Sequence, residues 1–191
     1  MHWPSPGITA RDKYENVIDF WLPHLNHMIH LTKQNQEVKD MLEIERILFP
    51  IDFTENSSKI LPYVLSVSEK YDAMIYLIHV VEDLVKWGGG SYIPHIPLDK
   101  YQEDALKGAE KALDRVCKEQ LQSCPNFQKR ILSGDPAQEI LKTIESEGID
   151  LVIMGTHGRK GLEHVFFGSV AENVVKKSPA PVLTINPYKV K

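Results

Sequence analysis

Only two cysteines, Cys117 and Cys124, occur in the 191 residues, and both fall in a stretch whose pattern predicts one helix. At about 1.5 Å of helix rise per residue they are separated by roughly 10 Å, which is too far for a disulfide. No neighbouring residues complete a metal site around either thiol. We therefore expect two inert cysteines in a reducing compartment.

Long apolar runs and a surplus of basic residues are also missing. No stretch approaches the ~18 apolar residues of a membrane span, and MHWPSPGITARDK has neither the basic start nor the apolar core of a signal peptide. The net charge is −4, and Lys and Arg are interspersed with acids rather than clustered, which argues against general nucleic-acid binding. These features predict a cytoplasmic protein that binds neither membranes nor nucleic acid.

The first part of the chain differs in pattern from the rest. Apolar side chains from Val17 to Leu31 recur at intervals of three and four, which indicates an amphipathic helix, and Pro23 divides that pattern. We predict an N-terminal helical extension over residues 1–45 that packs on the main domain or on a partner subunit. Residues 46–191 then form the main domain.

Beyond residue 45, short apolar runs alternate with helical patterns, as in a parallel sheet with helices between its strands. Strands are expected over residues 47–51, 73–81, 127–132, 151–154 and 182–185. Helices are expected over residues 55–68, 98–124, 136–147 and 169–177. Thr54 and Asp135 are candidate N-caps, Gly148 is a helix stop, and Pro62 should kink its helix or mark its true start. The pattern predicts a doubly wound α/β fold.

Three glycines and a serine follow the fourth expected strand. That strand ends at Gly155, and Gly158 and Gly168 precede Ser169, where a helical pattern begins. A backbone without Cβ can approach a ligand closely, and the helix start adds N–H groups and the positive end of a dipole. The arrangement predicts a phosphate site. Each residue also has a structural interpretation, since Ser169 and Glu172 have the spacing of a capping box.

The spacing Gly-x2-Gly-x9-Gly-Ser, from Gly155 to Ser169, resembles the nucleotide-binding signature of the universal stress protein family. The resemblance extends over roughly residues 44–187, through ILFPIDFTENS, GDPAQEIL and SPAPVLTIN. It implies an ATP-binding protein, with Mg²⁺ or Mn²⁺ bridging the phosphates, and five parallel strands in the order 3-2-1-4-5. Ligands bind such sheets where the strand order reverses, here between strands 1 and 4. Asp52 follows strand 1 and Gly155 follows strand 4, so the two should meet in space.

The resemblance also implies roles for individual residues. Asp52 should contact the ribose or the adenine side of the pocket, and the backbone of Val80 should face the adenine edge. His157 and Arg159 could pair with phosphate by their residue types. The remaining expected contacts are Pro50 and Ile51 lining the pocket, Met154 and Gly155 along the ribose, and Gly158, Gly168, Ser169 and Val170 at the phosphates.

Three functions are compatible with these features. The first is a non-catalytic, dimeric, ATP-binding regulator of the stress response, with no catalytic residue and no metal site made by protein side chains. The second is a slow ATPase or an ATP-using transferase, although no Walker-type lysine is present and the IDFTENSS stretch after strand 1 has no glycine. The third is a dimerisation scaffold with an unoccupied pocket. The apolar edge strand from Pro181 to Asn186 predicts a homodimer in each case.

Overall fold

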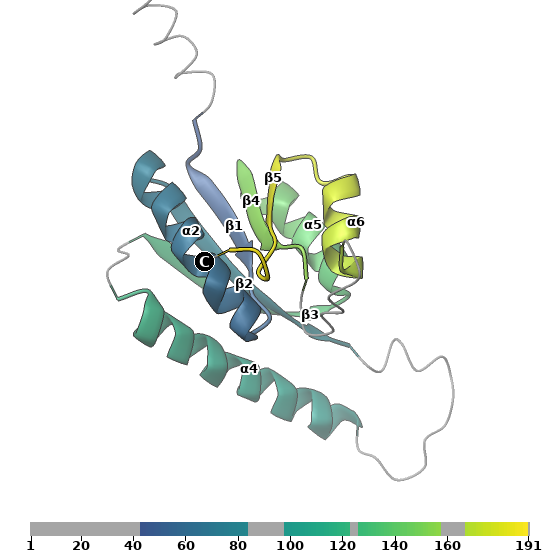
Figure 1. The fold of residues 1–191 in the computed structure, drawn as a ribbon. Helices are drawn as coiled ribbons and strands as arrows, with labels where there is room; N and C mark the ends of the chain where they lie inside the picture. The colour runs from purple at the N-terminus through teal and green to yellow at the C-terminus, as the bar shows by residue number, and fades with distance from the viewer. Residues whose placement is uncertain (1–42, 84–97, 123–125, 158–166, 191) are drawn as a thin grey trace, which may run out of the picture. The chain divides into compact units, whose positions relative to one another are not determined.

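The computed structural model describes residues 43–83, 98–122, 126–157 and 167–190 (Figure 1). Residues Ile44–Lys191 form one compact unit. The predicted N-terminal extension, residues 1–45, lies almost wholly outside the described ranges, as do Gly158 and Arg159. The extension and the domain boundary after it stay predictions.

A parallel sheet forms the centre of this unit, as the sequence predicted. Its described strands are β1 (Arg46–Pro50), β2 (Met74–Glu82), β3 (Phe127–Gly134), β4 (Leu151–Gly155) and β5 (Val182–Ile185). Their order is β3-β2-β1-β4-β5. β1 pairs with β2 up to Pro50↔Ile78, and with β4 through Ile47↔Leu151 and Leu48↔Val152. The strand order is the one that the family resemblance implied, with β3 at one edge.

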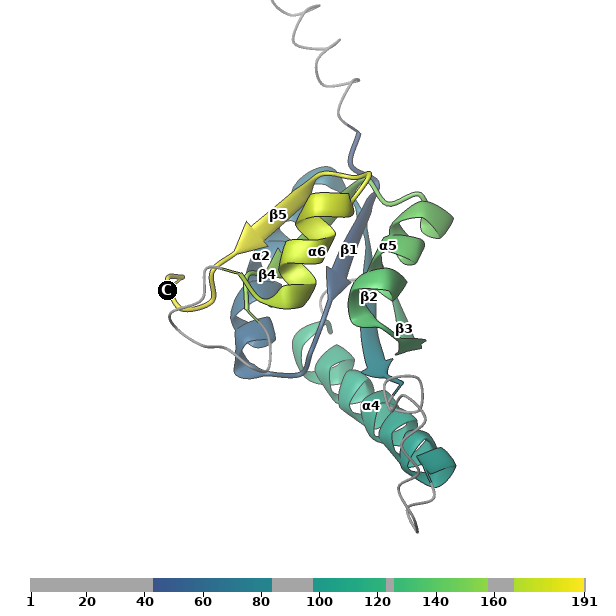
Figure 2. The ribbon, with the colours of Figure 1, turned by 90° about the vertical axis from the view of Figure 1, so that its right-hand side faces the viewer.

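Helices cover both faces of the sheet (Figures 1 and 2). The described helices are α2 (Glu55–Tyr71), α4 (Leu98–Gln120), α5 (Pro136–Glu147) and α6 (Ser169–Lys177). Because side chains alternate along a strand, Ile47 and Phe49 pack into the core beneath α2 and α4, while Leu48 joins the core beneath α5 and α6. None of the described helices combines the length and apolar character needed to cross a membrane.

The capping box predicted at the start of α6 is wrong. The N-cap is Gly168, in an extended conformation, and its carbonyl accepts a hydrogen bond from the Glu172 N–H at 2.9 Å. Ser169 is therefore the first helical residue, one position too late for a capping box. The Glu172 carboxylate instead accepts from the Lys176 ammonium at 2.6 Å.

Two helix ends differ from the sequence prediction. α2 begins at Glu55 after Thr54, as predicted, and runs through Pro62, so the proline does not mark its start; it ends at Tyr71, beyond the predicted residue 68. α4 ends at Gln120, before the predicted Cys124. The next residue, Leu121, is buried in the core, and its N–H donates to the Cys117 carbonyl at 3.2 Å. The caps of α5 are confirmed: Asp135 Oδ1 accepts from the Gln138 N–H at 2.9 Å, and Gly148 has a left-handed backbone.

Candidate functional site

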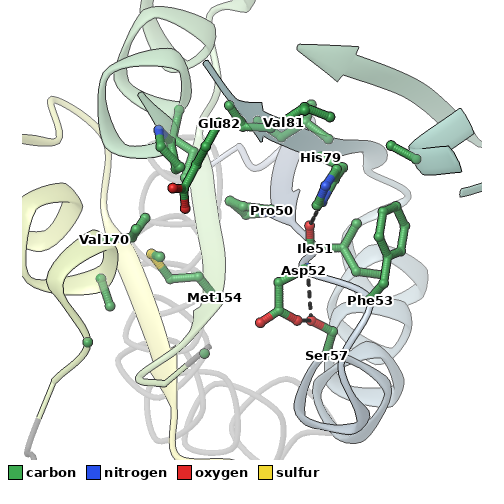
Figure 3. Close-up of a pocket in the computed structure, with 18 of the residues that line it drawn as sticks. Pro50, Ile51, Asp52, Phe53, Ser57, His79, Val81, Glu82, Met154 and Val170 are labelled. Carbon is green, nitrogen blue, oxygen red and sulfur yellow. Dashed lines mark hydrogen bonds between the residues drawn. The ribbon is translucent and has the colours of Figure 1, made fainter. Parts of the chain in front are cut away.

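A cavity of about 780 Å³ lies at the carboxyl ends of the strands, where the strand order reverses between β1 and β4 (Figure 3). Small-molecule sites commonly have volumes of ~300–1,000 Å³. Every predicted site residue within the described ranges lines this cavity: Pro50, Ile51, Asp52, Val80, Met154, Gly155, His157, Gly168, Ser169 and Val170. Gly158 and Arg159 lie outside those ranges. The fold thus brings Asp52 and Gly155 to one space, as predicted.

The Asp52 carboxylate is held by the turn that leads from β1 into α2. Its Oδ1 accepts hydrogen bonds from the Thr54 N–H at 3.0 Å, the Thr54 hydroxyl at 2.6 Å and the Ser57 hydroxyl at 2.5 Å. Such bonds fix a charged group in one orientation before any ligand arrives. Asp52 is therefore both a turn residue and a fixed acceptor on the cavity wall.

The backbone of Val80 is directed toward the space beyond the end of β1. In a parallel sheet, alternate residues direct both N–H and C=O to the same neighbouring strand. Met74 donates to Glu45 and Ile78 accepts from Ile51, so the even-numbered residues of β2 face β1. Val80 continues this series after the last β1 pair, Pro50↔Ile78. It consequently presents a donor and an acceptor side by side to the cavity.

His79 and Phe53 also line the cavity, and the sequence analysis did not single them out. The buried His79 ring places Nδ1 2.6 Å from the Ile51 carbonyl oxygen (Figure 3). The Phe53 ring centroid lies 4.2 Å from that of His79, and Phe53 has a φ of 62°, a strained value for a residue with a Cβ. A histidine within the apolar run MIYLIHVVE was the available signal, because buried polar groups need partners.

The two ends of the glycine loop are tied to each other. The Gly168 N–H donates to the Thr156 carbonyl at 2.8 Å, and the Thr156 N–H donates to Ile185 of β5 at 2.9 Å. His157 lines the cavity, but its ring is buried, with Nδ1 2.8 Å from the Thr156 hydroxyl and the Tyr188 ring edge-on at 5.4 Å. The residues on either side of the loop, after β4 and before α6, are therefore held at fixed points.

The first turn of α6 lies on the side of the cavity opposite Asp52 and Ser57, as the position of Val170 shows in Figure 3, with Met154 of β4 between them. Gly168, Ser169 and Val170 all line the cavity. The first N–H groups of a helix have no intrahelical partner, and the helix dipole favours an anion there. This wall can hold a negatively charged group without a basic side chain.

The charged side chains on the described cavity wall are both acidic. Asp52 and Glu82 contribute carboxylates, and the described lining includes no Lys or Arg. Within the described ranges, no group of three or more His, Cys, Asp or Glu side chains is placed to hold a metal ion. An anionic ligand at this wall would therefore depend on backbone N–H groups, the α6 dipole and any cation it carries.

Gly155 has a packing role that does not depend on a ligand. A Cβ at this position would lie 2.8 Å from Ile60 Cδ1 and 3.0 Å from the His157 carbonyl oxygen. Both distances are shorter than normal van der Waals contact. Glycine at the end of β4 thus lets α2 approach the sheet and also opens the cavity.

Comparison with known proteins agrees with this architecture. Residues 43–186 match the family model described as the Universal stress protein family. The chain is 31% identical to Universal stress protein MJ0577 of Methanocaldococcus jannaschii over 152 residues, which cover 74% of this chain and 94% of the relative. It is 26% identical to Universal stress protein YxiE of Bacillus subtilis, covering 73% of this chain and 97% of the relative.

Solved structures are similar as well. The structure of MJ0577 superposes with a TM-score of 0.65 at 29% identity, covering 75% of this chain and 96% of that chain. Universal stress protein UspA of Lactobacillus plantarum gives a TM-score of 0.64 at 22% identity, covering 75% and 99% of the two chains, which is a likeness of fold alone. With most of its length matched by the family model, the chain belongs to the universal stress protein family.

Proposed function

We propose that this protein binds ATP in the cavity and acts as a non-catalytic regulator whose partner binding depends on nucleotide occupancy. One observation carries the proposal: three walls of a single cavity present groups that suit the three parts of an adenine nucleotide. They are the Val80 backbone at the end of β2, the Asp52 carboxylate after β1 and the first turn of α6.

The base and the sugar would occupy the side of the cavity near β1 and β2. The Val80 N–H can donate to adenine N1, and its C=O can accept from the exocyclic amino group, since the two backbone groups point the same way. A ribose hydroxyl can donate to the Asp52 carboxylate, which offers about four lone-pair positions. Met154 and Gly155 would lie along the ribose, with Pro50 and Ile51 completing the wall.

The phosphates would lie at the first turn of α6. Gly168, Ser169 and Val170 can offer N–H groups at the positive end of the helix dipole, and Gly158 and Arg159 are predicted to join them. Because the charged residues of the described wall are acidic, a bound Mg²⁺ or Mn²⁺ would supply positive charge between the phosphate oxygens.

A regulatory role is favoured over catalysis by the positions of the charged groups. Rapid phosphoryl transfer requires a group near the phosphates that activates the nucleophile. Of the two carboxylates on the described wall, Asp52 is bound to the hydroxyls of Thr54 and Ser57 on the side opposite α6. It is therefore placed to contact the ribose rather than to activate a nucleophile at the phosphates.

The test is to denature freshly purified protein, identify any released nucleotide, and then titrate the nucleotide-free protein with ATP, ADP, AMP and cyclic AMP by calorimetry, with and without Mg²⁺. Gly168→Val and Ser169→Glu should each weaken ATP binding by at least about tenfold. The valine side chain would keep the phosphates away from the backbone, and the glutamate would add negative charge at the start of the helix. Val175→Glu adds the same charge to an exposed site on α6 outside the cavity and should bind as the wild type does.

Three outcomes separate the alternatives. Folded Gly168→Val and Ser169→Glu variants with undiminished affinity would disprove the phosphate site. Steady phosphate release by the wild type, lost in those variants, would show a slow ATPase instead of a regulator. A wild type that binds no adenine nucleotide would leave the dimerisation scaffold as the remaining function.

We also propose a cytoplasmic homodimer that pairs through residues 181–186. The backbone of β5 faces β4 at Pro181 and Ile185, so the groups of Val182 and Thr184 point to the open edge. Thr184→Pro removes one outward N–H and should give monomers in light scattering. Leu183→Pro is the contrasting variant, because its N–H faces β4 and its loss should destabilise the fold. A dimer that survives Thr184→Pro at all concentrations would refute edge pairing.

The free thiol of Cys117 is consistent with the proposed cytoplasmic location, because the cytoplasm is a reducing compartment.

A further inference from the structure

The hydrogen bond between His79 and Ile51 replaces one that the sheet would otherwise make. Odd-numbered residues of β1 face β2, and the last regular bond runs from the Ile51 N–H to the Ile78 carbonyl at 2.8 Å. In a regular parallel ladder, the next bond would run from the Val80 N–H to the Ile51 carbonyl. In this structure the Ile51 carbonyl oxygen lies 2.6 Å from Nδ1 of His79. A side chain therefore takes the place of a backbone donor.

The arrangement fixes the proton on the ring. A carbonyl oxygen can only accept, so His79 Nδ1 carries the hydrogen and donates it. The ring is buried, and Phe53 packs on it with a centroid distance of 4.2 Å and a tilt of 35°. Phe53 follows the Ile51-Asp52 pair directly and has a positive φ of 62°. The turn after β1 is thus folded around the imidazole, which keeps the two groups of the hydrogen bond together.

We propose that His79 is a positioning residue for base recognition: by capping the Ile51 carbonyl, it keeps the Val80 N–H available to the adenine edge. This inference rests on the proposed nucleotide site and identifies what makes that site selective for adenine. Adenine N1 accepts a hydrogen bond from an N–H donor. The corresponding position of hypoxanthine carries a hydrogen, so the base of ITP cannot accept from Val80 in the same orientation.

Removing the ring donor should make the Val80 N–H unavailable to the base. In His79→Leu, the Ile51 carbonyl loses its side-chain donor, and a buried carbonyl needs a replacement. The Val80 N–H is the nearest donor in ladder register, and it should extend the β1–β2 pairing by one bond. The base would then lose its donor, while the first turn of α6 is unaffected. Asn is the conservative replacement, because its Nδ2–H occupies a place similar to the histidine Nδ1–H.

The binding test uses the full chain and compares ATP with ITP. The wild type should prefer ATP by at least about tenfold, the magnitude expected for one well-made hydrogen bond. His79→Leu should lose the part of this preference that depends on the Val80 N–H, by binding ATP severalfold more weakly while binding ITP nearly unchanged. The part that depends on the exocyclic amino group and the Val80 C=O should remain. His79→Asn should keep the preference within about threefold of the wild type.

Ser68→Ala is the matched control. The Ser68 hydroxyl also donates to a backbone carbonyl, that of Ala73, at 2.6 Å, in a buried position at the other end of β2. Its loss should lower the melting temperature without changing the ratio of ATP to ITP affinity. A purely structural role for His79 would give the same result in His79→Leu, with both nucleotides affected equally.

Amide hydrogen exchange of Val80, followed by NMR, tests the same claim without a ligand. The Val80 N–H should exchange faster than that of Ile78 in the nucleotide-free wild type and become protected in His79→Leu. Protection of Val80 in the nucleotide-free wild type, or an unchanged ATP preference in His79→Leu, would overturn the inference. If the wild type binds no adenine nucleotide, the proposed function fails, and the exchange experiment still decides whether His79 keeps the Val80 N–H open.

Discussion

The backbone groups at the two ends of the sheet have different partners. At the amino end they are hydrogen-bonded to neighbouring segments of the protein: the Met74 N–H donates to the Glu45 carbonyl at 2.7 Å, and the Ile75 N–H donates to the Asn126 carbonyl at 3.0 Å. Asp150 Oδ2 accepts from the N–H groups of both Glu45 and Arg46. At the carboxyl end, the strands separate around a cavity. One end closes the structure, and the other presents its backbone groups to a ligand.

Side chains at each end determine which backbone groups are hydrogen-bonded within the protein and which face the cavity. At the amino end, the Arg46 guanidinium donates to the Glu147 and Gly148 carbonyls at the end of α5, so it satisfies acceptors that a helix end leaves open. At the carboxyl end, the His79 ring satisfies the Ile51 carbonyl and leaves the backbone of Val80 directed at the cavity. Stability and ligand binding should therefore be separable by mutation.

The largest effect on stability is expected at the amino end, from Asp150→Ala. It removes a charged acceptor from two N–H groups and should lower the free energy of unfolding by about 2–3 kcal/mol. ATP affinity should stay within about twofold of the wild type, because Asp150 is remote from the cavity wall. Urea denaturation and calorimetry measure the two quantities. A large loss of affinity in the folded variant would show that the ends are coupled.

The converse variant at the carboxyl end is Asp52→Asn. The amide keeps an oxygen for the Thr54 and Ser57 donors, so the free energy of unfolding should fall by about 1 kcal/mol or less. Loss of the charged acceptor for a ribose hydroxyl should weaken ATP binding by about tenfold, which is roughly 1.4 kcal/mol. Unchanged affinity, measured by the same titration, would remove Asp52 from the proposed site.

The amino-acid pattern predicted every described strand to within a few residues. The signal is clearest for β1, β2 and β4, which are short apolar runs buried on both faces. The strand order came from the family resemblance rather than from the residues, since periodicity does not say which strands are neighbours. Once that order was assumed, the meeting of Asp52 and Gly155 followed, and both do line the cavity. Local chemistry was also sufficient for the Asp135 and Gly148 caps of α5.

Features that depend on a single position or on tertiary contacts were not predictable from the residue pattern. The capping box at α6 failed because Gly168, not Ser169, is the N-cap. The role of His79 depends on the register of β1 against β2, which places the Ile51 carbonyl beside its ring. The packing role of Gly155 depends on Ile60, which is distant in the sequence. None of these relations is encoded by local spacing alone.

Gly155→Ala tests the junction of α2 with β4 and should have a smaller effect than Asp150→Ala. The new methyl group would meet Ile60 Cδ1 at 2.8 Å and the His157 carbonyl at 3.0 Å, and overpacking of this kind costs about 1–2 kcal/mol. Ile60→Val removes the nearer atom, so the double variant should recover part of the loss. Denaturant titration of both single variants and the double variant gives the coupling. Simple additivity would show that Ile60 is not the limiting contact.

The smallest effect is expected at Cys117. α4 lines the cavity from Tyr101 to Ala112, but Cys117 lies beyond that stretch and packs against the core beneath α2 and α4. Burial raises the pKa of this thiol, the opposing charge of Lys129 lowers it, and nearby Asp114 raises it. Burial is the largest contribution, so thiolate should be scarce at pH 8, and iodoacetamide should alkylate Cys117 severalfold more slowly than a free cysteine.

The dependence on pH and on Lys129 separates burial from charge. The alkylation rate of the native protein should rise with a midpoint above the ordinary pKa of a thiol, and Lys129→Met should move that midpoint higher still by removing the stabilising positive charge. ATP should change neither midpoint, because the cavity lining does not include Cys117. Mass spectrometry of the Cys117 peptide gives the rates. A midpoint shifted by ATP would show that ligand binding at the cavity-lining part of α4, from Tyr101 to Ala112, is transmitted along the helix to Cys117.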